Sequence, residues 1–211
     1  MTNQASNYFH NRVFAIAGGG SGIGFATVKQ LLTLGARVSL ADYRLPETLG
    51  TDLGGNDHNL LLMKVDVTSA KQVESWIQAT VKGWGRLDGA ANLAGTVAKD
   101  HNMGSILTTK DDDWARVLAV NIDGTRNCVR EQVKYIGKGY LEDFYGEKLK
   151  VGEGNPKAEG GSIVNTGSTL SLAGTAGTGA YAASKHAVLG LTRCVAKEIG
   201  PQGTRINCLC P

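Results

Sequence analysis

Short apolar runs along the chain alternate with stretches in which apolar residues recur at every third or fourth position. The run 13–17 has the composition of a buried strand, and Ile23, Leu31 and Leu34 follow it at helical spacing. Gly35 comes directly after this period and predicts the end of the helix. The same analysis predicts further strands at 36–41, 60–65, 87–93, 162–166 and 204–209, and further helices at 73–81, 114–136 and 181–199.

Six strands with helical crossovers between them predict an α/β fold, a doubly wound parallel sheet with helices on both faces. We expect one domain over residues 1–211. The stretch 137–161 is rich in glycine and charged residues, so we expect it to form a loop insertion. The chain stops at Pro211, directly after a predicted strand. We therefore expect that the domain is truncated and lacks its C-terminal strand.

Composition adds three exclusions to this picture. The 211 residues include 29 glycines, are 42% hydrophobic and carry a net charge of only +3, which gives no nucleic-acid footprint. The polar start, residues 1–12, has no apolar stretch for a signal peptidase or a bilayer. Cys128, Cys194, Cys208 and Cys210 lack the spacing of a zinc site or a disulfide scaffold. We expect reduced thiols, no metal, no membrane partner and a cytoplasmic protein.

A glycine-rich segment, 17–24, lies between the first predicted strand and the first predicted helix. Gly18, Gly22 and Gly24 have the spacing Gly-x-x-x-Gly-x-Gly. Glycines there let the backbone approach a pyrophosphate, whose charge is met by free N–H groups at the positive end of the helix. The position between a buried strand and an amphipathic helix favours a phosphate site over a flexible loop.

Asp42 ends the second predicted strand, 18 positions after Gly24. This is close to the spacing at which an acidic residue meets the adenosine ribose of a dinucleotide. A carboxylate there repels a 2′-phosphate, which favours NAD over NADP. Arg44, two positions further on, leaves NADP open, and an aspartate at a strand end is also a common turn residue.

Tyr181 and Lys185 are four positions apart on a predicted helix and share one of its faces. A phenol has an ordinary pKa near 10, so it needs help to act as a base at neutral pH. One positive charge about 4 Å away contributes on the order of 4 kcal/mol at intermediate dielectric. The pair is therefore a plausible device for proton transfer, although such a pair alone is also typical of a solvated helix edge.

Ser168 supports this hypothesis because it follows the fifth strand at the carboxyl edge of the sheet, where open α/β sheets place their ligands. Its hydroxyl could hold a substrate oxygen beside Tyr181. Gly124 lies within a long helical period with Asn121, where glycine costs about 1 kcal/mol relative to alanine. This cost indicates a bend with a purpose.

Taken together, residues 12–211 resemble the short-chain dehydrogenase/reductase family, in the branch with the Gly-x-x-x-Gly-x-Gly loop. Ser168 and Tyr181 are thirteen positions apart, which suits the family, and the other elements occur in its order. Those elements are Gly18 to Gly24, Asp66-Val67, Asn92-Leu93-Ala94-Gly95, Asn121, and Tyr181-Ala182-Ala183-Ser184-Lys185.

The resemblance implies a Rossmann-type fold and a hydride transfer between a nicotinamide cofactor and the hydroxyl or carbonyl carbon of a small alcohol or ketone. It implies that Tyr181 is the general acid or base and that Ser168 orients the substrate oxygen. Lys185 would hold the nicotinamide ribose and lower the pKa of the tyrosine, and Asn121 would keep a water that links the lysine to solvent. The implied cofactor-binding residues are Gly18, Gly20, Ser21, Gly22, Ile23, Gly24, Asp42, Asp66, Val67, Asn92, Ala94, Gly95, Tyr181 and Lys185.

Within that scheme, Asp66 would hydrogen-bond the adenine edge and Asn92 would line the cofactor cleft. Two positions depart from the family pattern, since Ala17 stands in place of a threonine and Leu93 in place of a second asparagine. Neither change touches a proton-transfer group, so at most weaker cofactor binding is expected.

Other hypotheses stay open at this point. The chain could be a dinucleotide-binding module without turnover, or it could catalyse a dehydration or epimerisation that recycles its cofactor. The two long helices, 114–136 and 181–199, carry more apolar residues than one buried face requires. This surplus predicts a homodimer or homotetramer, unless the extra residues pack internally.

Overall fold

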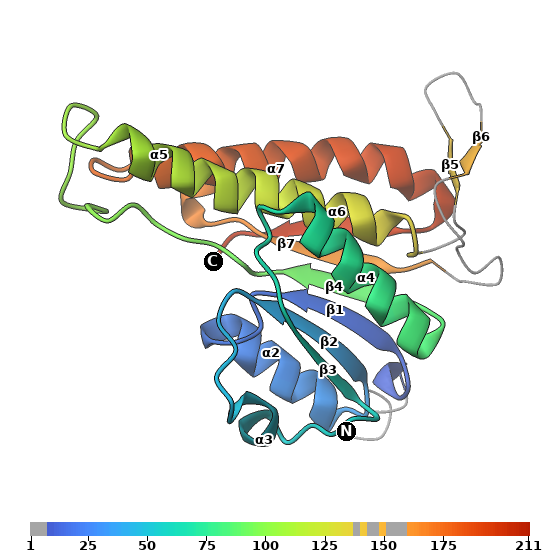
Figure 1. Ribbon diagram of the computed structural model, residues 1–211. Coiled ribbons are helices and arrows are strands. Elements are labelled where there is room, and N and C mark those ends of the chain that lie inside the picture. Colours follow the sequence, from blue (N-terminus) through green and yellow to red (C-terminus); the bar gives the residue numbers. More distant parts are fainter. Residues whose placement is uncertain (1–7, 137–139, 143–147, 151–159) are drawn as a thin grey trace.

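A computed structural model describes residues 8–136, 140–142, 148–150 and 160–211 (Figure 1). Its main sheet has six parallel strands in the order β3-β2-β1-β4-β7-β8, which confirms the predicted fold class. The strands are β1 (Val13–Ala17), β2 (Arg37–Asp42), β3 (Leu60–Lys64), β4 (Gly89–Asn92), β7 (Ser162–Thr166) and β8 (Arg205–Leu209). Each lies within two residues of its predicted bounds.

Helices cover both faces of this sheet, with α2 and α3 on one side and α4, α6 and α7 on the other (Figure 1). The helical segments are α2 (Gly22–Thr33), α3 (Leu49–Leu53), α4 (Ala70–Trp84), α5 (Asp111–Leu118), the π-helical η1 (Ala119–Asp123), α6 (Gly124–Val133), α7 (Gly179–Ile199) and the 3-10 turns η2 (Thr169–Ser171) and η3 (Gly200–Gln202). The sequence analysis did not predict α3, which is too short to show a helical period.

Alternation along β1 divides the core into two layers. Val13, Ala15 and Ala17 are fully buried toward α4, α6 and α7, whereas Ile16 packs with α2 and α3. A strand that is buried on both faces needs apolar residues at successive positions. This requirement explains why the predicted strands were continuous apolar runs.

The order of the strands reverses beside β1. From β1 the chain passes to β2 and β3 on one side, and it then crosses to β4 on the other. Loops at the carboxyl ends of β1 and β4 therefore run in opposite directions and leave a crevice between them. The sheet topology places the site at this edge.

The predicted helix 114–136 differs from the structure in three ways. It begins earlier, at Asp111, and ends earlier, at Val133. Its middle turn is the π-helical segment η1, which confirms a distortion beside Gly124. A Cβ on Gly124 would lie only 2.6 Å from Cγ2 of Val67, so this position needs glycine for the close approach of the helix to the end of β3.

The insertion 137–161 lies largely outside the described residues. Its described parts include two short strands, β5 (Tyr140–Glu142) and β6 (Lys148–Lys150), which pair antiparallel to each other. The prediction of a loop therefore missed a two-stranded ladder. No helix in the described part of the chain has the length and apolar character needed to span a membrane.

Replacement of Gly124 by alanine tests the close packing of α6. We expect Gly124→Ala to lower the free energy of unfolding by about 1–2 kcal/mol, because overpacking against Val67 outweighs the better helix propensity of alanine. Urea unfolding measures this change. Gly83→Ala in α4 is the matched control, since no atom lies within 4 Å of its Cβ position and a small stabilisation is expected. Equal stabilisation by both substitutions would contradict the packing argument.

Candidate functional site

The glycine-rich turn connects β1 to α2 and is closely packed. A Cβ on Gly24 would overlap the carbonyl oxygen of Gly18, and a Cβ on Gly18 would overlap the amide of Ala94. The N-cap residue of α2, Ser21, makes no side-chain capping bond, and the first turn holds no acidic residue. The first amides of α2 are therefore available to an anion, as a pyrophosphate requires.

Asp42 is the last residue of β2 and contacts this turn. Its Oδ2 accepts a hydrogen bond of 2.9 Å from the Gly20 amide, and its Oδ1 accepts one of 3.0 Å from the Arg44 amide. The carboxylate thus has a fixed orientation at the rim of the crevice. Gly20 acts here by holding Asp42, and it is not part of the crevice wall itself.

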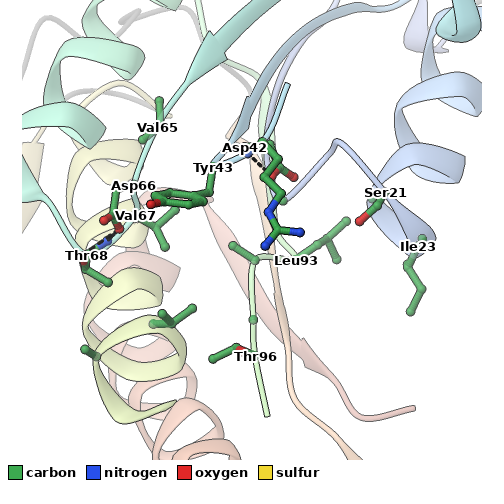
Figure 2. A pocket seen from close by; sticks show the side chains of 18 of the residues that line it. Ser21, Ile23, Asp42, Tyr43, Val65, Asp66, Val67, Thr68, Leu93 and Thr96 are labelled. Atoms are coloured by element: carbon green, nitrogen blue, oxygen red, sulfur yellow. Dashed lines mark hydrogen bonds between the residues drawn. The ribbon is translucent and has the colours of Figure 1, made fainter. Parts of the chain in front are cut away.

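A cleft of about 850 Å³ extends from the glycine turn across the carboxyl ends of β1, β2 and β4. This volume lies in the range of cofactor sites, about 300–1,000 Å³. Figure 2 shows the Tyr43 ring beside Asp66 and Val67, with Leu93 and Thr96 along another wall. The lining residues are Gly18, Ser21–Ile23, Gly24, Asp42, Tyr43, Arg44, Val65–Thr68, Leu93–Thr96, Arg116, Ala119 and Val120.

Most of the expected cofactor residues therefore lie in one cleft. The sequence analysis missed Tyr43, Thr68 and Arg116, although Tyr43 directly follows Asp42. Asp66 faces the cleft, where its Oδ1 accepts bonds from the amide and the hydroxyl of Thr68 at 2.9 and 2.7 Å. Its other carboxylate oxygen makes no hydrogen bond within the described residues.

Asn92 lies elsewhere than expected. It is 3% exposed, and its side chain exchanges hydrogen bonds with Gln132 at 3.0 and 2.8 Å and donates to Asn165 at 2.8 Å. Because alternate residues of a strand point to opposite faces, the wall of the cleft is formed by the next residue, Leu93. Asn92 is therefore part of a buried amide network that joins β4, β7 and α6.

Beyond Gly95 lie side chains of α7, which do not themselves line the cleft. The Lys185 ammonium lies 5.5 Å from the centre of the Tyr181 ring and donates a 2.7 Å hydrogen bond to the carbonyl of Thr166. A Cβ on Gly95 would lie 3.7 Å from Lys185 Nζ, which brings the lysine to the end of the cleft. The structure thus brings α7, the end of β7 and the loop after β4 together around Lys185.

Lys185 is only 4% exposed. Its burial lowers the pKa of its ammonium, while the thiols of Cys208 and Cys210 act in the opposite direction. Burial of a cation costs free energy, so this position is not a solvated helix edge. The cation is instead held where its field acts on the neighbouring Tyr181.

Ser168 follows β7 and is the N-cap of η2. Its amide donates to Ser171 Oγ at 3.0 Å, and its own Oγ accepts a 3.2 Å bond from the Leu170 amide. The Thr169 amide donates to the carbonyl of Pro211 at 2.9 Å, which ties this turn to the end of β8. The Ser168 hydroxyl proton makes no hydrogen bond within the described residues and can be donated to a ligand.

Asn121 lies in η1 and is fully buried. Its Oδ1 accepts a 2.8 Å bond from the Thr96 amide, and its Nδ2 donates to the Thr96 carbonyl and to Ser184 Oγ, both at 2.9 Å. Ser184 in turn donates to the carbonyl of Tyr181 at 2.7 Å. Asn121 therefore connects the loop after β4 to the turn of α7 that carries Tyr181.

The described residues contain no group of three His, Cys, Asp or Glu side chains arranged as metal ligands. What the site offers is an anion-binding turn, a carboxylate at the rim, an aromatic ring with a phenol next to a buried ammonium, and a serine hydroxyl after β7. Such an arrangement can hold a dinucleotide and exchange a proton with a bound molecule.

Known proteins match this chain over nearly all of its length. The family model for short chain dehydrogenase matches residues 12–211. The short-chain dehydrogenase/reductase aba4 of Botryotinia fuckeliana is 37% identical over 210 residues, which cover 98% of this chain and 73% of the relative.

Solved structures give the same result. Levodione reductase superposes with a TM-score of 0.79 at 30% identity, over 96% of this chain and 72% of that one. NAD+-bound xylitol dehydrogenase has the same TM-score at 25% identity, over 96% and 70%. Complexes with NAD+ and with NADPH both occur among the structural matches. The chain therefore belongs to the short-chain dehydrogenase family, whose members are NAD(P)-dependent oxidoreductases acting on hydroxyl and carbonyl carbons.

Proposed function

We propose that Tyr181, Ser168 and Lys185 form the catalytic site of this oxidoreductase, which transfers a hydride between a nicotinamide cofactor and a small alcohol or ketone. The observation that carries the proposal is the buried ammonium of Lys185, 5.5 Å from the Tyr181 ring. A module that only binds a dinucleotide has no need for a buried cation beside a phenol. This costly arrangement favours an enzyme that turns over.

Each side chain has a distinct role in the proposal. The dinucleotide, when bound, supplies the hydride carrier. In the oxidative direction Tyr181 takes the proton from the substrate hydroxyl, and in reduction it returns that proton to the same oxygen. Ser168 donates a hydrogen bond to this oxygen and holds it beside Tyr181. Lys185 stabilises the phenolate by its positive charge.

Asn121 is a positioning residue in this scheme. Its bonds to Thr96 and Ser184 fix the turn of α7 that carries Tyr181. A Cβ on Gly95 would lie within 4 Å of both Asn121 Oδ1 and Lys185 Nζ. This proximity supports the expected role of Asn121 in holding a water beside the lysine.

The position of each residue along the cleft suggests which part of the dinucleotide it would contact. The amides at the start of α2, with Gly18, Ser21, Gly22, Ile23 and Gly24, would meet the pyrophosphate. Asp66 and Val67 would face the adenine, and Ala94 and Gly95 would line the path toward the nicotinamide ribose, which Lys185 would hold. Asn92, whose amide is occupied within the core, would support this wall from behind.

NAD is the proposed cofactor in preference to NADP. Asp42 is held by two backbone amides at the rim, so its charge cannot swing away from a 2′-phosphate. Both Arg44 and Tyr43 are exposed beside it. The fixed carboxylate repels the extra phosphate at close range, and this repulsion supports NAD.

A homodimer or homotetramer remains our proposal for the assembly. Of the apolar residues that suggested it, Cys128, Val129, Val195 and Ile199 are buried in the core of this chain. Leu118 and Leu189 are only half-buried along the outer helices and support the proposal, whereas Val120 lines the cleft. We also propose that residues 1–211 form one domain and that the protein is cytoplasmic.

Replacement of Tyr181 by phenylalanine tests the catalytic role. We expect Tyr181→Phe to lower kcat by a factor of about 10² or more, because the proton carrier is lost. Nicotinamide absorbance with a panel of alcohols and ketones measures the rate, and dinucleotide titration should show binding retained. Tyr8→Phe, at an exposed tyrosine, is the matched control. Undiminished turnover by Tyr181→Phe would overturn the assignment.

Replacement of Asp42 by asparagine tests the cofactor preference. We expect the wild type to bind NAD more tightly than NADP, and Asp42→Asn to reduce this preference about tenfold, since removal of the charge relieves on the order of 1.4 kcal/mol of repulsion. Titration with both dinucleotides gives the ratio. Asp52→Asn removes an exposed charge from α3 and should leave the ratio unchanged. A wild type that prefers NADP would show that Asp42 has another role.

Replacement of Lys185 by methionine tests the burial of the ammonium. The pKa of the Lys185 ammonium is lower in the folded chain than in the unfolded chain. As the pH rises, the folded chain therefore loses this proton first, and the unfolded chain keeps it until the pH reaches about 10.4. The wild type should therefore gain stability relative to Lys185→Met as the pH rises toward that value. Urea unfolding across this range measures the difference. The exposed Lys197→Met serves as control, and an equal trend in both variants would contradict the effect of burial.

A further inference from the structure

The loop between β4 and α5 carries a histidine that the catalytic scheme does not use. The ring of His101 packs against the ring of Tyr181, with centres 5.3 Å apart and planes at 76°. His101 is half-buried, and its Nδ1 is fully buried without a hydrogen-bond partner among the described residues. A buried polar atom without a partner costs free energy and calls for an explanation.

The backbone on both sides of His101 is held in place. On one side, the Lys99 amide donates a 2.6 Å bond to Asp113 Oδ2. On the other side, the Asn102 amide donates a 3.0 Å bond to the carbonyl of Gly177. The ring of His101 therefore has a fixed place over Tyr181, as a recognition group requires.

Asn102 has a φ of +67°, and Gly177 has a φ of +79° where the two segments meet. A Cβ on Gly177 would lie 3.0 Å from Cα of Asn102, so glycine permits this close approach. Asparagine tolerates the left-handed conformation better than most residues. The chain thus accepts an uncommon backbone geometry in order to keep the loop against the start of α7.

The surroundings of the ring define its chemistry. With Nδ1 enclosed, Nε2 is the ring nitrogen that a bound molecule can reach. Nε2 makes no hydrogen bond to the described residues, and it is not one of the buried atoms. His101 therefore offers one accessible ring nitrogen, on a ring that packs against Tyr181, for a hydrogen bond to an oxygen atom of a ligand.

We propose that His101 recognises a second oxygen atom on the substrate, on a carbon adjacent to the one that reacts. The preferred substrates are then vicinal diols, α-hydroxyketones or α-diketones rather than simple alcohols and ketones. This inference rests on the proposed function, because it takes the Tyr181 hydroxyl as the partner of the reacting oxygen.

The short separation of the two rings limits the distance between the two oxygens. Because the ring centres lie 5.3 Å apart, we expect the oxygens that hydrogen-bond to the two rings to belong to neighbouring parts of one substrate. Oxygens on adjacent carbons satisfy this condition, whereas an oxygen at the far end of a long substrate does not. His101 is thus a specificity residue, and proton exchange stays with Tyr181.

The test compares trans-cyclohexane-1,2-diol with cyclohexanol, two probes that differ by one hydroxyl group. We expect wild type with NAD to oxidise the diol with the higher kcat/KM, and His101→Phe to lower the diol-to-cyclohexanol ratio about tenfold, mainly through KM. Phenylalanine keeps an aromatic ring against Tyr181 and removes the donor. His101→Gln restores a donor and should recover part of the ratio.

Met103→Ala is the matched control, since this side chain is 82% exposed in the same loop. It should leave the ratio unchanged. The proposal is overturned if wild type shows no preference for the diol, or if His101→Phe lowers both values of kcat/KM by the same factor. Thermal unfolding of each variant reports whether the fold is retained.

A binding measurement separates this proposal from the proposed function. Calorimetric titration of both probes into Tyr181→Phe with NAD should show tighter binding of the diol, and His101→Phe in that background should remove the difference. A diol preference in binding without turnover by the wild type would refute the proposed catalysis and keep the role of His101. Equal binding of both probes would refute the role of His101 alone.

Discussion

The site depends on one buried cation. Lys185 is 4% exposed and, among the described residues, makes one hydrogen bond, from Nζ to the carbonyl of Thr166, which fixes α7 to the end of β7. An ammonium in such surroundings is costly, and its pKa falls because burial disfavours its charge. The same low-polarity surroundings let its charge act strongly on Tyr181, 5.5 Å away. In our proposal, this cost is offset by the role of the ammonium beside the Tyr181 phenol.

The parallel sheet makes this arrangement possible, because it brings the carboxyl ends of all strands to one edge. The glycine turn and Asp42 come from β1 and β2, and Ser168 comes from β7. The π-helical turn η1 adds Asn121, whose three hydrogen bonds join the loop after β4 to α7. A regular α-helix would present this side chain at a different angle, so the local distortion supports the alignment of the site.

In our proposal, different parts of the fold bind the dinucleotide and select the substrate. The glycine turn, Asp42 and Asp66 belong to rigid strand ends, which suits a cofactor common to a whole family. His101 belongs to a surface loop, where changes of sequence alter specificity without disturbing the sheet. Its unpartnered nitrogen and the left-handed Asn102 mark this loop as a recognition element. In our proposal, specificity is thus adjusted beside Tyr181, outside the cofactor cleft.

The sequence by itself determined the strands, most of the helices and the glycine turn, because these depend on local periodicity and on the conformational freedom of glycine. The order of Ser168, Tyr181 and Lys185 along the chain also identified the family to which it is similar. Only the tertiary structure decided which side chains meet. It moved Asn92 from the cleft into an amide network and placed His101 against Tyr181, eighty positions away in the chain. Contacts between distant segments follow from the packing of whole elements, and no local pattern encodes them.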